Sequence, residues 1–176
     1  MNRHCPDHYV ESSAEQSLAT TEALITYIHS LPLSNISGTS DPLVRPIITP
    51  RFAISCTPDL LTSLGKLAAS DSTLRIQTHI SENPKEVALT KKLFPKSKTY
   101  AGVYDDHGLL RENTILAHAV HLEVAEMKLI AKRKAGVSHC PTSNFHLSSG
   151  VASVGEYLDR GIKVWRKYHP IIPSIY

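Results

Sequence analysis

Residues 74–80 read Leu-Arg-Ile-Gln-Thr-His-Ile and alternate apolar with polar side chains, which is the period of a β-strand. A turn at residues 70–72 separates this strand from leucines at helical spacing, and that helix is expected to begin at residues 57–58, Thr-Pro. Another helix is expected over residues 84–94, because Pro95 cannot continue the hydrogen-bond ladder. A helix, a strand and a helix in this order indicate one unit of an α/β fold.

The same alternation continues along the rest of the chain. Short apolar runs predict strands at residues 46–49, 114–118, 137–140 and 162–165, and helical periodicity predicts helices over 12–29, over 124–131, closed by Gly136, and over 151–158. Turn-forming residues predict a loop over residues 31–46. Strands that alternate with helices imply a parallel sheet, so the expected class is α/β with about five parallel strands. The 176 residues are fewer than the roughly 250 of a complete (β/α)₈ barrel.

Composition and charge limit the classes of function. The chain is 41% hydrophobic and 20% charged, as in ordinary globular proteins. A net charge of +3 is too small to predict a nucleic-acid or membrane partner. The three cysteines show no CxxC spacing, which favours neither a disulfide framework nor a zinc ribbon. No apolar run is long enough for a signal peptide or a membrane span, so we expect a cytoplasmic location.

Reactive side chains lie near the ends of the predicted strands. Arg51 follows the first strand; His79 ends the second, with Glu82 three residues further on; His118 ends the third, and His139 lies in the fourth. The carboxyl ends of parallel strands meet at one edge, so these side chains are expected to converge there. Imidazole binds Zn²⁺, and a carboxylate beside a metal-bound water can move protons. The pattern therefore indicates a hydrolytic zinc site.

Each residue also has an ordinary structural interpretation. A histidine at a strand end is usually a hydrogen-bonded structural residue, and a carboxylate at a helix start is favoured by the helix dipole. Taken alone, Arg51 is an ion-pairing surface residue and Phe52 a core residue. The run Ser-His-Cys at 138–140 does not predict a nucleophile pair, because neighbours in a strand point to opposite faces. Single residues thus leave both interpretations open.

Four short motifs follow one another in a specific order. They are Thr-Pro-Arg-Phe at 49–52, His-Ile-Ser-Glu-Asn at 79–83, Leu-Ala-His at 116–118 and Ser-His-Cys-Pro-Thr-Ser-Asn at 138–144. Their order and spacing resemble the guanine deaminase family of the metal-dependent amidohydrolase superfamily. The resemblance implies a partial TIM-type barrel domain over residues 1–164, followed by a divergent tail over residues 165–176.

The resemblance also implies a reaction and a set of site residues. Members of the family use zinc to hydrolyse guanine to xanthine and ammonia. By this resemblance His79 is a metal ligand, and Glu82 and His118 are catalytic, Glu82 carrying protons between water and the purine. Arg51 and Phe52 match positions that contact the purine.

Two metal-binding motifs of the family have no match in this sequence. No H-x-H pair occurs in the 176 residues, and the segment after Val164 does not resemble the G-x-G-T-D-like segment that carries the family's aspartate ligand. His79 is then one of four ligands expected for the zinc ion. We expect the sequence to be truncated at both ends and inactive on its own.

The expected partner is a small purine, guanine, with no nucleic acid and no membrane, and the intact family implies a homo-oligomer. Two alternatives stay open. One is an amidohydrolase that acts on another amino-purine or heterocycle. The other is a non-catalytic fragment that binds a full-length homologue. The role of His139 is also open.

Overall fold

The computed structural model describes residues 1–31, 42 and 44–166. Most of the loop expected over residues 31–46, and residues 167–176 of the expected tail, lie outside the described residues. The strands are β1 (Ile47–Ile48), β2 (Arg75–Ile80), β3 (Thr114–His118), β4 (Gly136–His139) and β5 (Lys163–Arg166). The helices are α1 (Ala14–Ser30), α2 (Pro58–Ser70), α3 (Pro84–Leu93), α4 (Tyr100–Asp106), α5 (Val124–Lys132), α6 (Pro141–His146) and α7 (Val154–Asp159), with 3-10 turns at Asp7–Tyr9 and Ala53–Ser55.

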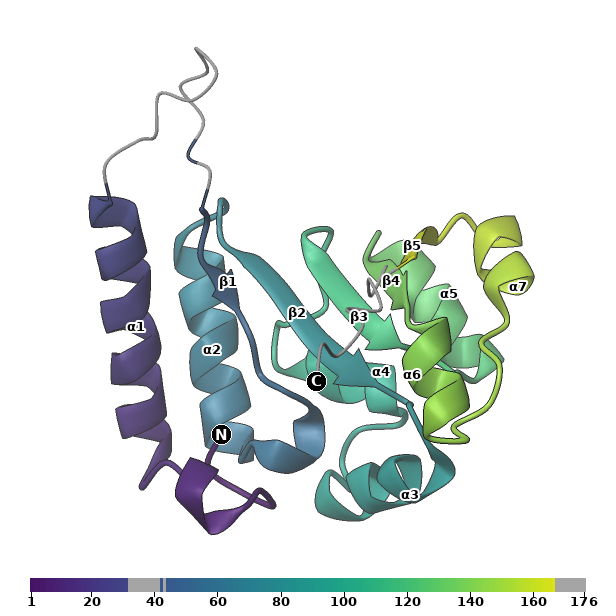
Figure 1. Cartoon of the computed structure of the whole chain (residues 1–176), viewed down its shortest axis with the longest axis horizontal. Helices are drawn as coiled ribbons and strands as arrows, with labels where there is room; N and C mark the ends of the chain where they lie inside the picture. Colours follow the sequence, from purple (N-terminus) through teal and green to yellow (C-terminus); the bar gives the residue numbers. More distant parts are fainter. Residues whose placement is uncertain (32–41, 43, 167–176) are drawn as a thin grey trace, which may run out of the picture.

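The strands form one parallel sheet in the order β1-β2-β3-β4-β5. Strand order that follows chain order, with a helix in each connection, is the arrangement of a (β/α) barrel wall. The helices α2, α4 and α5 lie behind the sheet in Figure 1. The predicted class, α/β with five parallel strands, is therefore confirmed.

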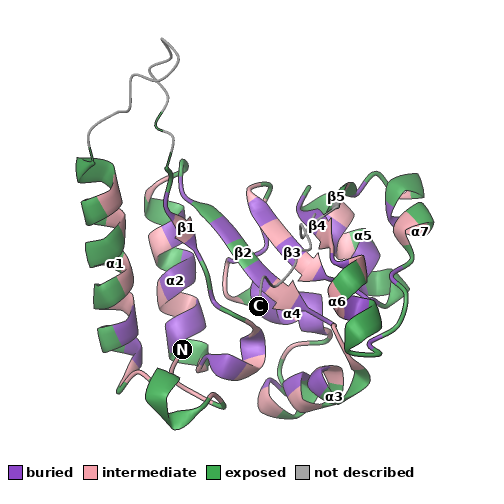
Figure 2. Cartoon of the chain, viewed as in Figure 1, coloured by how far each residue is buried: buried purple, intermediate pink, exposed green. Residues whose placement is uncertain are grey.

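The core lies between the sheet and these helices. Along β2 the side chains of Ile76, Thr78 and Ile80 are buried, whereas Arg75 and Gln77 are exposed. Figure 2 shows the same alternation of buried and exposed positions along the strands. The polar face that the sequence predicts for this strand is thus the face away from the covering helices.

Local sequence signals fix where the helices begin. The Thr57 side chain accepts a hydrogen bond from the Leu60 amide at the start of α2, as a Thr-Pro start predicts. At α3, Asn83 accepts from the Glu86 amide, and the Glu86 carboxylate accepts from the Asn83 amide, forming a capping box. These caps place the loop between β2 and α3, which carries Glu82.

The prediction that Gly136 closes the preceding helix is wrong. The helix α5 ends at Lys132, and Lys134 takes the left-handed conformation with φ 57°. Gly136 instead begins β4, where an added Cβ would lie 2.0 Å from the Trp165 ring. A methyl group at this position would therefore push the exposed Trp165 ring aside. Helices α4 and α6 were not predicted.

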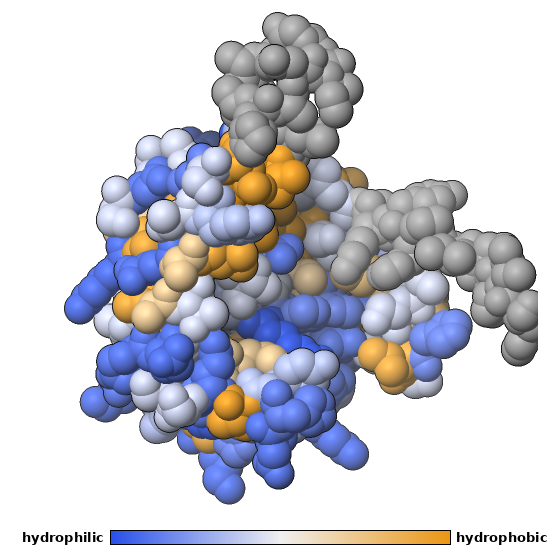
Figure 3. Space-filling view, turned by 60° about the vertical axis from the view of Figure 1, so that its left-hand side comes forward, coloured by the Kyte–Doolittle hydropathy of each residue, from blue (hydrophilic) through white to orange (hydrophobic). Residues whose placement is uncertain are grey.

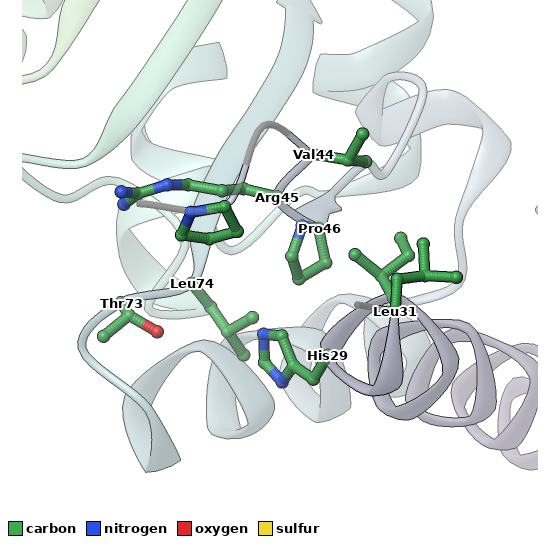
Figure 4. Close-up of a pocket in the computed structure, with 9 residues that line it drawn as sticks. His29, Leu31, Val44, Arg45, Pro46, Thr73 and Leu74 are labelled. Carbon is green, nitrogen blue, oxygen red and sulfur yellow. The ribbon is translucent and has the colours of Figure 1, made fainter. Parts of the chain in front are cut away.

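A pocket of about 310 Å³ lies near the amino end of β2, far along the strand from His79. Figure 4 shows its lining, in which Pro46 lies between Leu31 and Leu74, and His29 lies beside Leu74. Hydrophobic surface also gathers in the upper part of the space-filling view in Figure 3. The pocket lies at the opposite end of the strand from the predicted catalytic residues, so it is not part of their site.

Candidate active site

The rings of His79 and His118 meet where β2 and β3 end. The register pairs Ile80 with His118, so strict alternation would turn the His118 side chain away from His79. The backbone leaves strand geometry there, with φ 70° at His118 and 51° at Ala119. The two rings stack with their centroids 5.1 Å apart. A left-handed non-glycine residue costs about 1–3 kcal/mol, and such strain is concentrated at functional sites.

A single carbonyl fixes the orientation of the His79 ring. The Arg51 carbonyl oxygen lies 2.6 Å from His79 Nδ1 and also accepts from the His79 backbone amide at 2.9 Å. Donation from Nδ1 leaves the lone pair on Nε2, which is the atom that can bind a metal. Burial lowers the pKa of His79, which favours the neutral ring that a ligand requires. His79 therefore fits the role of a zinc ligand.

His118 lies between two oxygen-bearing side chains. Its Nδ1 is 2.8 Å from Asn144 Oδ1 and 3.6 Å from Glu82 Oε1. The His118 side chain is buried, whereas 19% of the Glu82 side chain is exposed. Glu82 thus reaches solvent beside the stacked histidines, which is where a group that exchanges protons with water has to lie.

Arg51 and Phe52 extend this row of rings on the other side. The Arg51 guanidinium lies 5.1 Å from the centroid of the Phe52 ring. The Phe52 ring in turn meets the His79 ring edge-on at 6.1 Å. A cation, an aromatic ring and two imidazoles therefore lie in one row of pairwise contacts, and its cationic and aromatic members are groups that can bind a flat, polar heterocycle.

The structure brings together every residue that the sequence proposed for catalysis, metal binding or purine contact. His139 is the last residue of β4 and is half-buried, and its role stays open. The sequence interpretation gave no role to Asn144, although this residue ends the fourth motif. It also missed Glu86, whose carboxylate accepts hydrogen bonds from the Glu82 and Asn83 amides at 2.8 and 3.4 Å. The capping-box spacing was the signal that could have identified Glu86.

Within the described part of the chain, no group of three or more His, Cys, Asp or Glu side chains is placed to hold a metal ion. A catalytic zinc site takes about three protein ligands and one open position. His79 thus fits as one ligand of a set that the described residues do not complete. Over the same residues, no helix is long and apolar enough to cross a membrane.

Relatives of this chain are named as guanine deaminases. A probable guanine deaminase of Schizosaccharomyces pombe is 54% identical over 164 residues, which are 93% of this chain and 30% of that protein. The guanine deaminase of Dictyostelium discoideum is 44% identical, over 99% of this chain and 38% of that protein. The chain therefore spans about a third of the length of the curated relatives it matches.

A solved structure supports the same relationship. The guanine deaminase from C. acetobutylicum, crystallised with guanine bound in its active site, aligns with a TM-score of 0.82 and 40% identity. The alignment covers 94% of this chain and 37% of that one. A model of the amidohydrolase family matches residues 1–165. The sheet, the site at its carboxyl edge and these similarities agree that the chain belongs to the amidohydrolase family.

Proposed function

We propose that this chain carries part of the active site of a guanine deaminase, which hydrolyses guanine to xanthine and ammonia with the help of zinc. The observation that supports it most is the continuous row of Arg51, Phe52, His79 and His118, with Glu82 at its edge. The names of the similar proteins favour guanine as the purine. Homo-oligomerisation and a cytoplasmic location stay predictions.

The site residues divide the reaction between them. Water must add to the carbon that bears the amino group, a proton must reach the purine, and the amine must leave as ammonia. A bound zinc ion would lower the pKa of the attacking water. Glu82 takes one proton from water and delivers it to a purine ring nitrogen, since its carboxylate is open to solvent beside His118. It then takes the second proton from the added hydroxyl and delivers it to the amine as the C–N bond breaks. Near the reacting carbon His118 accepts a hydrogen bond at Nε2, because its Nδ1 proton is donated to Asn144 Oδ1.

The remaining residues hold the metal and the substrate. His79 would hold zinc through Nε2, because its Nδ1 is engaged by the Arg51 carbonyl. The Phe52 ring supports one face of the purine, and the Arg51 guanidinium contacts its oxygen or ring nitrogens. Additional metal ligands would have to join His79 for zinc to bind tightly.

A chimera tests this function. Residues 1–164 would replace the aligned segment of the Schizosaccharomyces pombe relative, and guanine conversion would be followed by absorbance. We expect turnover within about tenfold of the parent, and a loss of about a hundredfold or more on Glu82→Gln, the usual range for removing a general acid–base group. The matched control is Glu112→Gln, which changes an exposed carboxylate of the same chain.

The result can contradict the proposal in two ways. A folded, zinc-loaded chimera without guanine turnover would show that residues 1–164 do not form this site. Faster turnover of adenine than of guanine would favour the alternative of another amino-purine.

A further inference from the structure

The hydroxyl of Tyr104 on α4 lies beneath the candidate site with every hydrogen-bonding position occupied. It accepts from the Ala53 amide at 2.9 Å and from Thr78 Oγ1 at 2.9 Å, and it donates to the His79 carbonyl at 2.7 Å. A phenol offers one donor and two acceptor positions, so these contacts use its full capacity. The Tyr104 side chain is fully buried, and burial raises its pKa, so the hydroxyl keeps its proton.

These three contacts join two separate parts of the site. Ala53 directly follows Arg51 and Phe52, the two residues expected to contact the purine. His79 is the expected ligand at the end of β2, and Thr78 precedes it. The Arg51 carbonyl also links these segments, because it lies within hydrogen-bond distance of the His79 ring, the His79 backbone amide and Thr78 Oγ1. Tyr104 adds a separate link, contributed by a helix that itself supplies no residue to the row of rings.

We infer that Tyr104 is a positioning residue that sets the distance between the purine-contacting segment and the His79 ring. This inference rests on the proposed function, because the distance matters only if these segments form a catalytic site; the hydrogen bonds of Tyr104 do not depend on it. A short shift between these segments would separate the Arg51 carbonyl from His79 Nδ1, and the ring would lose the tautomer that presents Nε2. The positions of reactive groups have to be fixed to within fractions of an ångström. Buried hydrogen bonds such as those of Tyr104 therefore matter for a catalytic site.

The test compares the whole chain with its Tyr104→Phe variant by NMR. Without the hydroxyl, the Ala53 amide and the His79 carbonyl lose a buried partner. We expect exchange of the Ala53 amide with solvent to accelerate about 10- to 100-fold more than that of Leu116 in β3, which reports global unfolding. We also expect the ¹⁵N signals of the His79 ring to move from a single Nδ1–H tautomer toward a mixture, a change that loss of packing alone would not produce.

The matched control is Tyr157→Phe in α7. Tyr157 is also buried, but its hydroxyl donates to the Ala119 carbonyl rather than contacting Ala53 or His79. This variant should leave the His79 tautomer unchanged and the Ala53 exchange within about twofold of Leu116. Should Tyr104→Phe fail to fold, Thr78→Val removes one of the two donors to the phenol in a similar shape, with an expected acceleration at Ala53 of about threefold.

Equal acceleration at Ala53 and Leu116 together with an unchanged His79 tautomer, in whichever of the two variants folds, would overturn the inference. The measurement uses neither zinc nor guanine. A negative NMR result would therefore not affect the conclusion from the chimera, and an inactive chimera would not affect the conclusion about the Tyr104 hydrogen bonds.

Discussion

At the scale of single residues, the environment of His118 decides what the site can do. Asn144 Oδ1 accepts from His118 Nδ1, and the Asn144 side chain is buried. This bond fixes which ring nitrogen carries the proton and leaves Nε2 as the acceptor. Because Glu82 lies near the same Nδ1, the orientation of the ring and the position of the carboxylate depend on each other.

Asn144→Ala should therefore destabilise the chain and free the His118 ring. Removing the acceptor leaves a buried imidazole N–H without its partner, at a cost of about 1–3 kcal/mol in the free energy of unfolding. Urea denaturation measures this loss, with Thr142→Ala, at an exposed position of the same helix, as the control. Equal stabilities of the two variants would mean that the bond to His118 contributes nothing.

At the scale of elements, α2 packs unusually close to the turn after α4. Gly65 is buried within α2, and an added Cβ there would lie 1.9 Å from the His107 carbonyl oxygen. Backbone on the other side of the contact cannot move as a flexible side chain can. The glycine thus allows the close approach of the two elements.

Gly65→Ala should cost about 1–3 kcal/mol in the free energy of unfolding, because the methyl group forces α2 away from His107. Gly155→Ala is the control, since nothing lies within 4 Å of its added Cβ in α7. That variant should be stabilised by roughly 0.5–1 kcal/mol through helix propensity alone. Thermal or urea unfolding of both variants gives the comparison, and similar gains from both would show that Gly65 is not needed for packing.

The buried carboxylate of Glu126 joins two helices. It accepts from the Ala101 amide of α4 at 2.9 Å and from the Glu123 amide at the start of α5 at 2.8 Å. Burial raises the pKa of Glu126 above its ordinary value of 4.5. As the pH rises through 4.5 the unfolded carboxyl loses its proton, whereas the folded one loses it only at higher pH.

Glu126 should therefore lower the free energy of unfolding as the pH rises from 4.5 upward. The Glu126→Gln variant cannot ionise there, so its stability relative to the wild type should increase from pH 4.5 upward. Glu22→Gln on the exposed side of α1 removes a carboxylate without this effect and is the control. Urea unfolding at several pH values measures the difference, and parallel curves for the wild type and Glu126→Gln would contradict the assignment.

The elements differ in how far the sequence could predict them. Strand β2 follows from the alternation of residues 74–80, and the end of helix α3 follows from Pro95; both are local signals. The short helices α4 and α6, of seven and six residues, depend on packing against the sheet rather than on periodicity, so the sequence pattern did not reveal them.

The candidate site shows the same limit. The sequence could predict that its motifs lie together, because the carboxyl ends of parallel strands meet at one edge of the sheet. The stacking of His118 on His79 could not, because it depends on the left-handed backbone at His118. The role of Tyr104 could not either, because its partners lie 25 to 51 residues away in the sequence.

At the scale of the whole molecule, the described residues form one parallel sheet, and at its carboxyl edge His79 is oriented to bind zinc. Purified alone, it should therefore hold zinc at well below one ion per chain and show no guanine turnover above background. Elemental analysis and an absorbance assay measure both quantities, with a full-length guanine deaminase as the positive control. Stoichiometric zinc with substantial turnover would refute this prediction.

Side chains from β2, from β3 and from the loop after β2 converge at one rim. A nuclear Overhauser measurement between the ring protons of His79 and His118 in the isolated chain tests this convergence. Rings stacked at 5.1 Å should give a cross-peak between them. A folded chain with both rings assigned and no cross-peak would place the imidazoles apart and contradict the account.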